Sequence, residues 1–212
     1  NGGSFTAQSI TNNGAINVTG EALVAAEVAA TETGSFTITD ATLGEGSRIQ
    51  FSAMNVEKLL PAVTLKGTVT VTDGAYLNAG REGNLTMGFG TGDSGTLNIS
   101  NGAQISLGGA LYFGSEEALT DDGMFYLNIS GEGSRLQSDG FNGEFYITGD
   151  AVVTVSNGGT IANNARVRSG ATYIFGAADD TVAANVNFSK MELVEQANVT
   201  IQGGAVADLG IL

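Results

Sequence analysis

The sequence predicts an all-β fold, a right-handed parallel β-helix of about eight to ten coils, formed by residues 1–212 as a single domain. Three observations support this fold: short segments in which apolar and polar residues alternate, glycine-rich turns between those segments, and internal repetition. At 212 residues the chain is long enough to bury a substantial core without disulfides. We expect it to be a fragment of a longer secreted protein.

The alternating segments have an apolar residue at every second position, separated by Thr, Ser or Asn. In a strand this spacing places the apolar side chains on one face and the polar side chains on the other. We expect strands at Ala15–Thr19, Ser35–Thr39, Thr68–Thr72, Asn84–Met87, Thr96–Ser100, Tyr126–Ser130, Glu144–Thr148, Val152–Ser156 and Asn198–Gln202. Two other stretches, Glu21–Ala30 and Asn55–Leu60, are candidates for a turn or two of helix at most.

The turns between strands are rich in glycine. The chain has 32 glycines and one proline, which suits many tight turns and strands that keep their amide donors. An Asx-Gly pair follows a strand at 73–74, 101–102 and 157–158. In such a pair the Asx side chain hydrogen-bonds to the nearby backbone, and glycine adopts the left-handed conformation.

A seven-residue segment is repeated: Gly44–Gln50 (GEGSRIQ) recurs 87 residues later as Gly131–Gln137 (GEGSRLQ). Because both copies lie between predicted strands, we expect Gly46 and Gly133 in left-handed turns. The apolar residue near the end of each copy, Ile49 or Leu136, is expected to point into the core. The alternative is that Glu132 and Arg135 form a binding pair repeated along the molecule.

The Asn-Gly turns leave the topology open, because they are also typical of β-hairpins. The turn recurs once in roughly 25 to 30 residues and is followed by another short strand, which favours a coil whose equivalent residues stack on one another. A β-sandwich or jelly roll is the first alternative, and a propeller or mixed fold is the second.

The composition excludes several classes of function. The chain has no Cys and no His, so thiol chemistry, disulfides and imidazole-based mechanisms are absent. The formal net charge is −14, and nucleic acid and anionic membranes bind through clusters of Lys and Arg. We therefore expect neither nucleic-acid binding nor direct membrane contact by this segment.

Candidate catalytic or ligand-binding residues are few. The glycine-rich stretch Gly88–Gly95 is followed by a predicted strand, and a nucleotide loop requires a helix there. Paired carboxylates occur at Glu116-Glu117, Asp121-Asp122 and Asp179-Asp180, but adjacent residues of a strand point to opposite faces. Arg166 and Arg168 share a strand face with no acid beside them. We expect no catalytic, metal or cofactor site, and no enzyme activity.

Three further patterns are interpreted as structural. The Thr arrays at Thr37/Thr39 and Thr68/Thr70/Thr72 are too irregular for an ice-binding lattice. The aromatic cluster Phe141–Tyr146 is the one plausible sugar platform, although core packing is the preferred interpretation. Six Asn-x-Ser/Thr triplets follow from the alternation of polar residues within strands: those of Asn17, Asn84, Asn98, Asn128, Asn187 and Asn198.

These repeats resemble the β-helical passenger repeats of Gram-negative autotransporter proteins. The matching stretches are Gly44–Gln50, Val69–Ala75, Met87–Ala103, Gly131–Gln137 and Val152–Ile161. They cover roughly half the chain, mostly between residues 35 and 165, and both ends match poorly. The resemblance implies a secreted or cell-surface location, on the extracellular side of the outer membrane.

The function expected from this fold is that of a surface-exposed stalk mediating adhesion or self-association. Continuous rows of Asn, Thr, Ser and Asp along the sides of a β-helix suit many weak hydrogen bonds, and avidity then replaces a deep pocket. The expected partner is a second copy, or a host protein or glycan. A secreted polysaccharide hydrolase or lyase on the same fold, and a purely structural spacer, are the alternatives.

Overall fold

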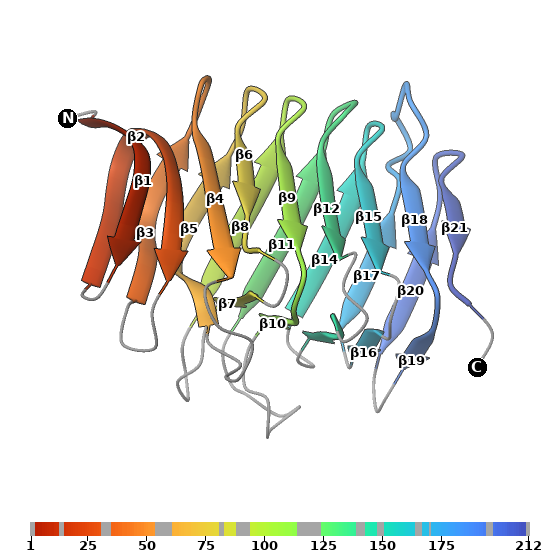
Figure 1. Ribbon diagram of the computed structural model, residues 1–212. Helices are drawn as coiled ribbons and strands as arrows, with labels where there is room; N and C mark the ends of the chain where they lie inside the picture. The colour runs from red at the N-terminus through yellow and green to blue at the C-terminus, as the bar shows by residue number, and fades with distance from the viewer. Residues whose placement is uncertain are drawn as a thin grey trace.

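The computed structural model describes residues 3–12, 15–30, 35–53, 61–80, 83–87, 94–113, 124–138, 143–147, 151–163, 167–169, 171–193 and 197–210. These residues form strands, turns and bends, with no helix among them. Among these residues there is therefore no helix that is long and apolar enough to cross a membrane. All strand pairs are parallel, and the strands stack along one axis (Figure 1).

The strands form three sheets, one on each side of the solenoid. Sheet 1 contains β8 (Gly95–Ser100), β11 (Phe125–Ser130), β14 (Ala151–Ser156), β17 (Thr172–Phe175) and β20 (Asn198–Ile201). Sheet 2 contains β1 (Gly3–Asn12), β4 (Arg48–Ala53), β6 (Tyr76–Asn78), β9 (Gln104–Leu107), β12 (Arg135–Ser138), β15 (Thr160–Asn163), β18 (Asn185–Phe188) and β21 (Val206–Asp208). Sheet 3 contains β7 (Asn84–Met87), β10 (Leu111–Phe113), β13 (Phe145–Ile147), β16 (Val167–Ser169) and β19 (Met191–Leu193).

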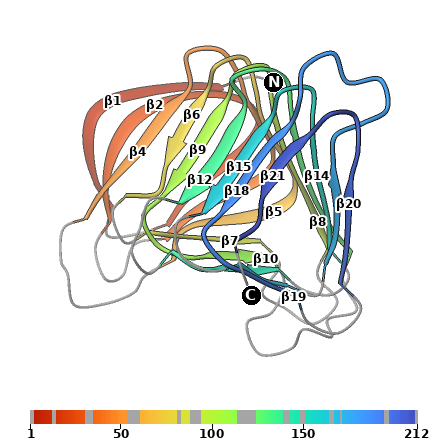
Figure 2. The same cartoon turned by 90° about the vertical axis from the view of Figure 1, so that its right-hand side faces the viewer.

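Each coil visits the sheets in the order 3, 1, 2 and then returns to sheet 3 one step further along the axis. In Figure 1 the chain runs up sheet 1 at the back and down sheet 2 at the front while advancing from the N-terminus to the C-terminus, which is a right-handed path. Figure 2, seen along the axis, places sheet 2 and sheet 1 on opposite sides, with sheet 3 below them. The right-handed parallel β-helix predicted from the sequence is thus confirmed.

The coils are of two kinds. Five successive coils, from β7 to β21, have a separate strand in each sheet. Three N-terminal coils instead contain long strands that bend from one sheet into the next without a break: β2 (Ala15–Ala30), β3 (Ser35–Leu43) and β5 (Pro61–Val71). The five regular three-strand coils are fewer than the eight to ten coils predicted, and the lower end of that prediction is reached only when the three coils of long strands are added.

The long strands turn the corner between sheets 3 and 1 at one left-handed residue in each coil. These residues are Gly20 (φ 70°), Asp40 (φ 43°) and Gly67 (φ 64°), and the strand register shifts beside the first two. The Asp40 carboxylate accepts a hydrogen bond of 2.9 Å from the Thr68 amide of the next coil. A positive φ reverses the local bend, so a single residue redirects the strand.

The predicted strands agree with the structure to within one residue at their ends, with Thr148 outside the described residues, and one helix candidate does not agree. Thr96–Ser100, Tyr126–Ser130 and Val152–Ser156 lie within β8, β11 and β14. Glu21–Ala30 is part of strand β2, so its assignment as a candidate helix was wrong. Its Ala and Glu residues favour a helix locally, but its Val residues favour a strand, and pairing with β1 and β4 satisfies the backbone on both sides. Asn55–Leu60 lies outside the described residues.

The core consists of apolar rows that run parallel to the axis. Within sheet 1, Val71, Ile99, Ile129, Val155 and Phe175 lie in register in successive coils and are at most 1% exposed. The row ends at Ile201 in β20, which is 50% exposed. In the C-terminal coils aromatic side chains fill the interior, and the ring centroids of Tyr173 and Phe175 are 5.6 Å apart.

The corner between sheets 1 and 2 is a tight turn with a small residue just after it. The Asx-Gly pairs have positive φ at both residues, for example 51° at Asn101 and 78° at Gly102, which is the signature of a type I′ turn. The turn is closed by a 3.0 Å hydrogen bond from the Ala103 amide to the Ser100 carbonyl. The residues after the corners are small because they face the interior of a tight bend: Ser47, Ala75, Ala103, Ser134, Gly159, Ala184 and Ala205.

We predict that Gly133→Ala lowers the free energy of unfolding by about 1 kcal/mol, because Gly133 has a φ of 81° and an L side chain is strained there. A Cβ would approach Gly102 Cα at 3.4 Å, so lack of space is not the cause. Urea unfolding measures the effect. The matched control is Gly44→Ala in the other copy of the repeat, where no positive φ and no neighbour oppose a Cβ. Equal losses in both variants would contradict the assignment.

Candidate functional site

The repeated Gly-Glu-Gly-Ser-Arg segment forms a second type of corner between sheets 1 and 2. Gly46 (φ 80°) and Gly133 (φ 81°) have positive φ, whereas Glu45 and Glu132 do not, which is the signature of a type II turn. The turns are closed by 3.0 Å hydrogen bonds from the amides of Ser47 and Ser134 to the carbonyls of Gly44 and Gly131. The predicted left-handed glycines are thus confirmed.

The serine of this segment joins the type II corner to the preceding coil. The Gly74 amide donates to the Asn101 carbonyl of the next corner, because both corners are of the type I′ kind. The Gly102 amide faces a type II corner instead, and it donates to Ser134 Oγ at 3.0 Å. Ser134 is fully buried. The hydroxyl therefore satisfies an amide that the change of turn type leaves without a carbonyl.

Ser47 has the same role in the first copy of the segment. Its hydroxyl accepts a 3.3 Å hydrogen bond from the Val24 amide and donates to the Ala22 carbonyl at 3.1 Å, both in the preceding coil. Ile49 and Leu136 are fully buried, as predicted. The described residues contain no ion pair between Glu132 and Arg135, and both side chains point into solvent. The glycines and the serine of the repeat therefore have a structural role, and the role of the serine hydroxyl could not be assigned from spacing alone.

From residues 67–71 of β5 to β20, the outer face of sheet 1 is an uncharged polar surface. At the N-terminal end, the row that contains Thr70 continues through Thr42 to the exposed Glu21. Residues 67–71 of β5 and the strands β8, β11, β14, β17 and β20 contain no Asp, Glu, Lys or Arg. Their outward side chains form rows that are hydrogen-bonded along the axis. Asn98 Nδ2 donates to Thr70 Oγ1 at 3.3 Å, and Asn128 Nδ2 donates to Asn98 Oδ1 at 2.9 Å. The predicted polar rows are therefore present on a flat sheet face.

The outer face of sheet 2 differs in having positive charge. Arg48, Tyr76, Gln104 and Arg135 form one outward row across β4, β6, β9 and β12. The Arg48 guanidinium lies over the Tyr76 ring, 4.8 Å from its centroid. Asn78 Nδ2 donates to the Tyr76 hydroxyl at 2.9 Å. The tyrosine ring is thus held at its face and at its hydroxyl.

Of the carboxylate pairs, only Asp179-Asp180 lies in the described part of the chain. It belongs to the corner between β17 and β18, where Asp180 Oδ2 accepts a 2.9 Å hydrogen bond from the Ala177 amide. No three acidic side chains among the described residues lie close enough to hold a metal ion. Glu116-Glu117, Asp121-Asp122 and Arg166 fall outside the described residues, and for Arg168 only the backbone, in β16, is described.

The aromatic cluster at 141–146 is divided between the core and the surface. Phe145 is fully buried, which agrees with the preferred interpretation, whereas Phe141 lies outside the described residues. Tyr146 faces outward on sheet 3 and stacks on Tyr112, with ring centroids 5.2 Å apart and planes 6° apart. Its hydroxyl donates to Glu144 Oε2. Because the rings stack along the axis, each covers a face of the other.

The remaining sequence patterns lie on strands, as predicted. All six asparagines of the Asn-x-Ser/Thr triplets belong to strands, and Asn84 is buried with its Oδ1 accepting a 2.7 Å hydrogen bond from the Ala110 amide. The Thr68/Thr70/Thr72 array is on sheet 1, where Thr72 Oγ1 accepts from Ser100 Oγ at 2.9 Å. These side chains form the axial rows of the solenoid.

No protein-family model matches the chain, and neither the curated proteins nor the solved structures show a significant match.

We predict that Ser134→Ala lowers the free energy of unfolding by about 1–3 kcal/mol, because it leaves the Gly102 amide without a partner beside a buried side chain. The matched control is Ser156→Ala on the outer face of sheet 1, which should change stability by less than about 0.5 kcal/mol. Urea denaturation followed by circular dichroism measures both. A Ser134→Ala variant as stable as the control would contradict the role assigned to the hydroxyl.

Proposed function

We propose that this chain is a surface-exposed β-helical stalk that self-associates through the outer face of sheet 1. The observation that carries the proposal is the absence of Asp, Glu, Lys and Arg from 67–71, β8, β11, β14, β17 and β20, in a chain of formal net charge −14. Two copies of an acidic protein repel each other. When the same face of each copy meets, the electrostatic cost is lowest where that face is neutral.

Hydrogen bonding supports the same face. An Asn side chain has two amide hydrogens and two carbonyl lone pairs. In the axial row, Asn128 uses one amide hydrogen toward Asn98, and Asn98 uses one toward Thr70. The row fixes the orientation of these amides while leaving hydrogen-bonding capacity for a partner. Each contact is weak, and repetition along the axis supplies the avidity.

Shape supports a broad contact instead of a pocket. The strands of sheet 1 lie side by side over the length of the solenoid in Figure 1, so a partner meets an extended surface. Three apolar side chains add area to it: Tyr126, which is 39% exposed, and the half-buried Val152 and Ile174. The proposed location is the extracellular surface of the cell, in keeping with the passenger-like repeats.

We predict that beads coated with the chain form clusters and that Thr154→Lys reduces clustering several-fold, because it places a charge at the centre of the neutral face in both copies. The matched control is Thr160→Lys in the same coil, which adds the same charge to sheet 2 and should leave clustering unchanged. Clusters are counted by light scattering. Loss of clustering in the control alone would assign association to sheet 2, and no clustering of the unsubstituted chain would overturn the proposal.

A further inference from the structure

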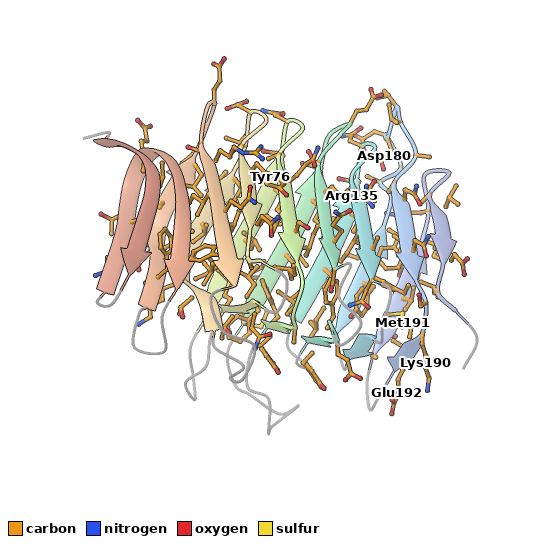
Figure 3. All side chains as sticks on the ribbon, viewed as in Figure 1. Tyr76, Arg135, Asp180, Lys190, Met191 and Glu192 are labelled. Carbon is orange, nitrogen blue, oxygen red and sulfur yellow. The ribbon has the colours of Figure 1, made fainter. Side chains whose placement is uncertain are left out.

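The outer face of sheet 2 has a charge opposite to that of the whole chain. The chain has 22 acidic and 8 basic residues. The strands β4, β6, β9, β12, β15 and β18 nevertheless contain two arginines, Arg48 and Arg135, and no Asp or Glu. Both arginines are exposed and both belong to the same outward row. Tyr76 and Arg135 lie on the side that faces the viewer in Figure 3.

The acidic residues around this face lie at its borders. Glu45 and Glu132 are exposed in the corners that precede the two arginines. In the neighbouring outward row, Asp208 of β21 pairs with Asn187 at one end. At the other end the backbone of Gln50 is in register with Glu27 of β2. Between those ends the row contains Gln50, Asn78, Ser106, Gln137, Ala162 and Asn187. The centre of the face is therefore a cationic strip bordered by amides and hydroxyls.

We propose that this strip binds a carboxylate-bearing polysaccharide that lies along the solenoid axis. A guanidinium forms paired hydrogen bonds with a carboxylate, and amide and hydroxyl side chains suit the hydroxyl groups of sugars. Arg48 and Arg135 are separated by three coil steps, roughly 14 Å at about 4.8 Å per step. One carboxylate cannot contact both, so the partner is a polymer with repeated acidic groups.

The arrangement of the strip favours a sugar polymer over an acidic peptide or a nucleic acid. The face is a flat sheet whose central outward residues are polar, and peptide recognition uses pockets for side chains. The Tyr76 ring already carries the Arg48 guanidinium on one face and is held by Asn78 at its hydroxyl. A dense phosphate backbone would also meet strong repulsion from a chain of formal net charge −14. A polymer with sparse carboxylates meets less.

The test measures binding of hyaluronan, a polymer of alternating uronate and neutral sugars, to the full chain by biolayer interferometry. We expect hyaluronan to bind and neutral dextran not to bind. Arg48→Gln and Arg135→Gln should each weaken binding about fivefold, as expected for one exposed charge-assisted contact. Arg135→Lys should restore part of the affinity, because it keeps the charge and loses the planar fork.

The matched control is Lys190→Gln, which removes one exposed positive charge outside sheet 2. It should leave binding unchanged. If Lys190→Gln weakened hyaluronan binding as much as the arginine variants do, the weakening would be due to overall charge, and the proposal would be overturned. Failure of hyaluronan to bind, or tighter binding of heparin or of a DNA oligonucleotide, would also overturn it. The proposal is independent of self-association through sheet 1, and Thr154→Lys, which affects that face alone, should bind hyaluronan as the unsubstituted chain does.

Discussion

The fold depends on the continuity of backbone hydrogen bonds from coil to coil, including the corner between sheets 1 and 2. There the first amide of each sheet 2 strand donates to a carbonyl of the preceding coil. The Tyr76 amide donates to the Ser47 carbonyl, and the same bond joins Gln104 to the Ala75 carbonyl and Arg135 to the Ala103 carbonyl. In the coils from Ser47 onward, the residue after this corner is small, whereas the continuous strand β2 has Val24 at the equivalent position. Once this position is fixed, the inward rows and the outward rows follow from the two-residue period of the strands.

The repeated Gly-Glu-Gly-Ser segment is explained by the same constraint. A type II corner stacked on a type I′ corner leaves one amide without a carbonyl, and the buried Ser134 hydroxyl accepts its hydrogen bond. Elsewhere in this row alanine is sufficient, as at Ala75 and Ala103. In the second copy the Gly-Glu-Gly-Ser part of the motif therefore joins two kinds of turn, and in the first copy Ser47 bonds to the continuous strand β2.

The sequence predicted the strands well where they are long and their apolar and polar residues alternate, and less well elsewhere. The strand at 96–100 and the left-handed Gly133 follow from local patterns. The three-residue strands β10 and β19 are too short to show alternation, and β2 has a composition that favours a helix. The two polar faces could not be distinguished in advance, because whether residues 48 and 135 share a row depends on three intervening pairings.

The spacing of the two repeat copies has a consequence for how such a chain can change in length. Ile49 pairs with Leu77, Leu77 with Ile105, and Ile105 with Leu136, so the 87 residues between the copies amount to three whole coils. Duplication of a whole number of coils preserves every inward row. Duplication of part of a coil would rotate the following strands about the axis and direct apolar side chains to the solvent. Selection for solubility would thus retain genes that lengthened in units of complete coils.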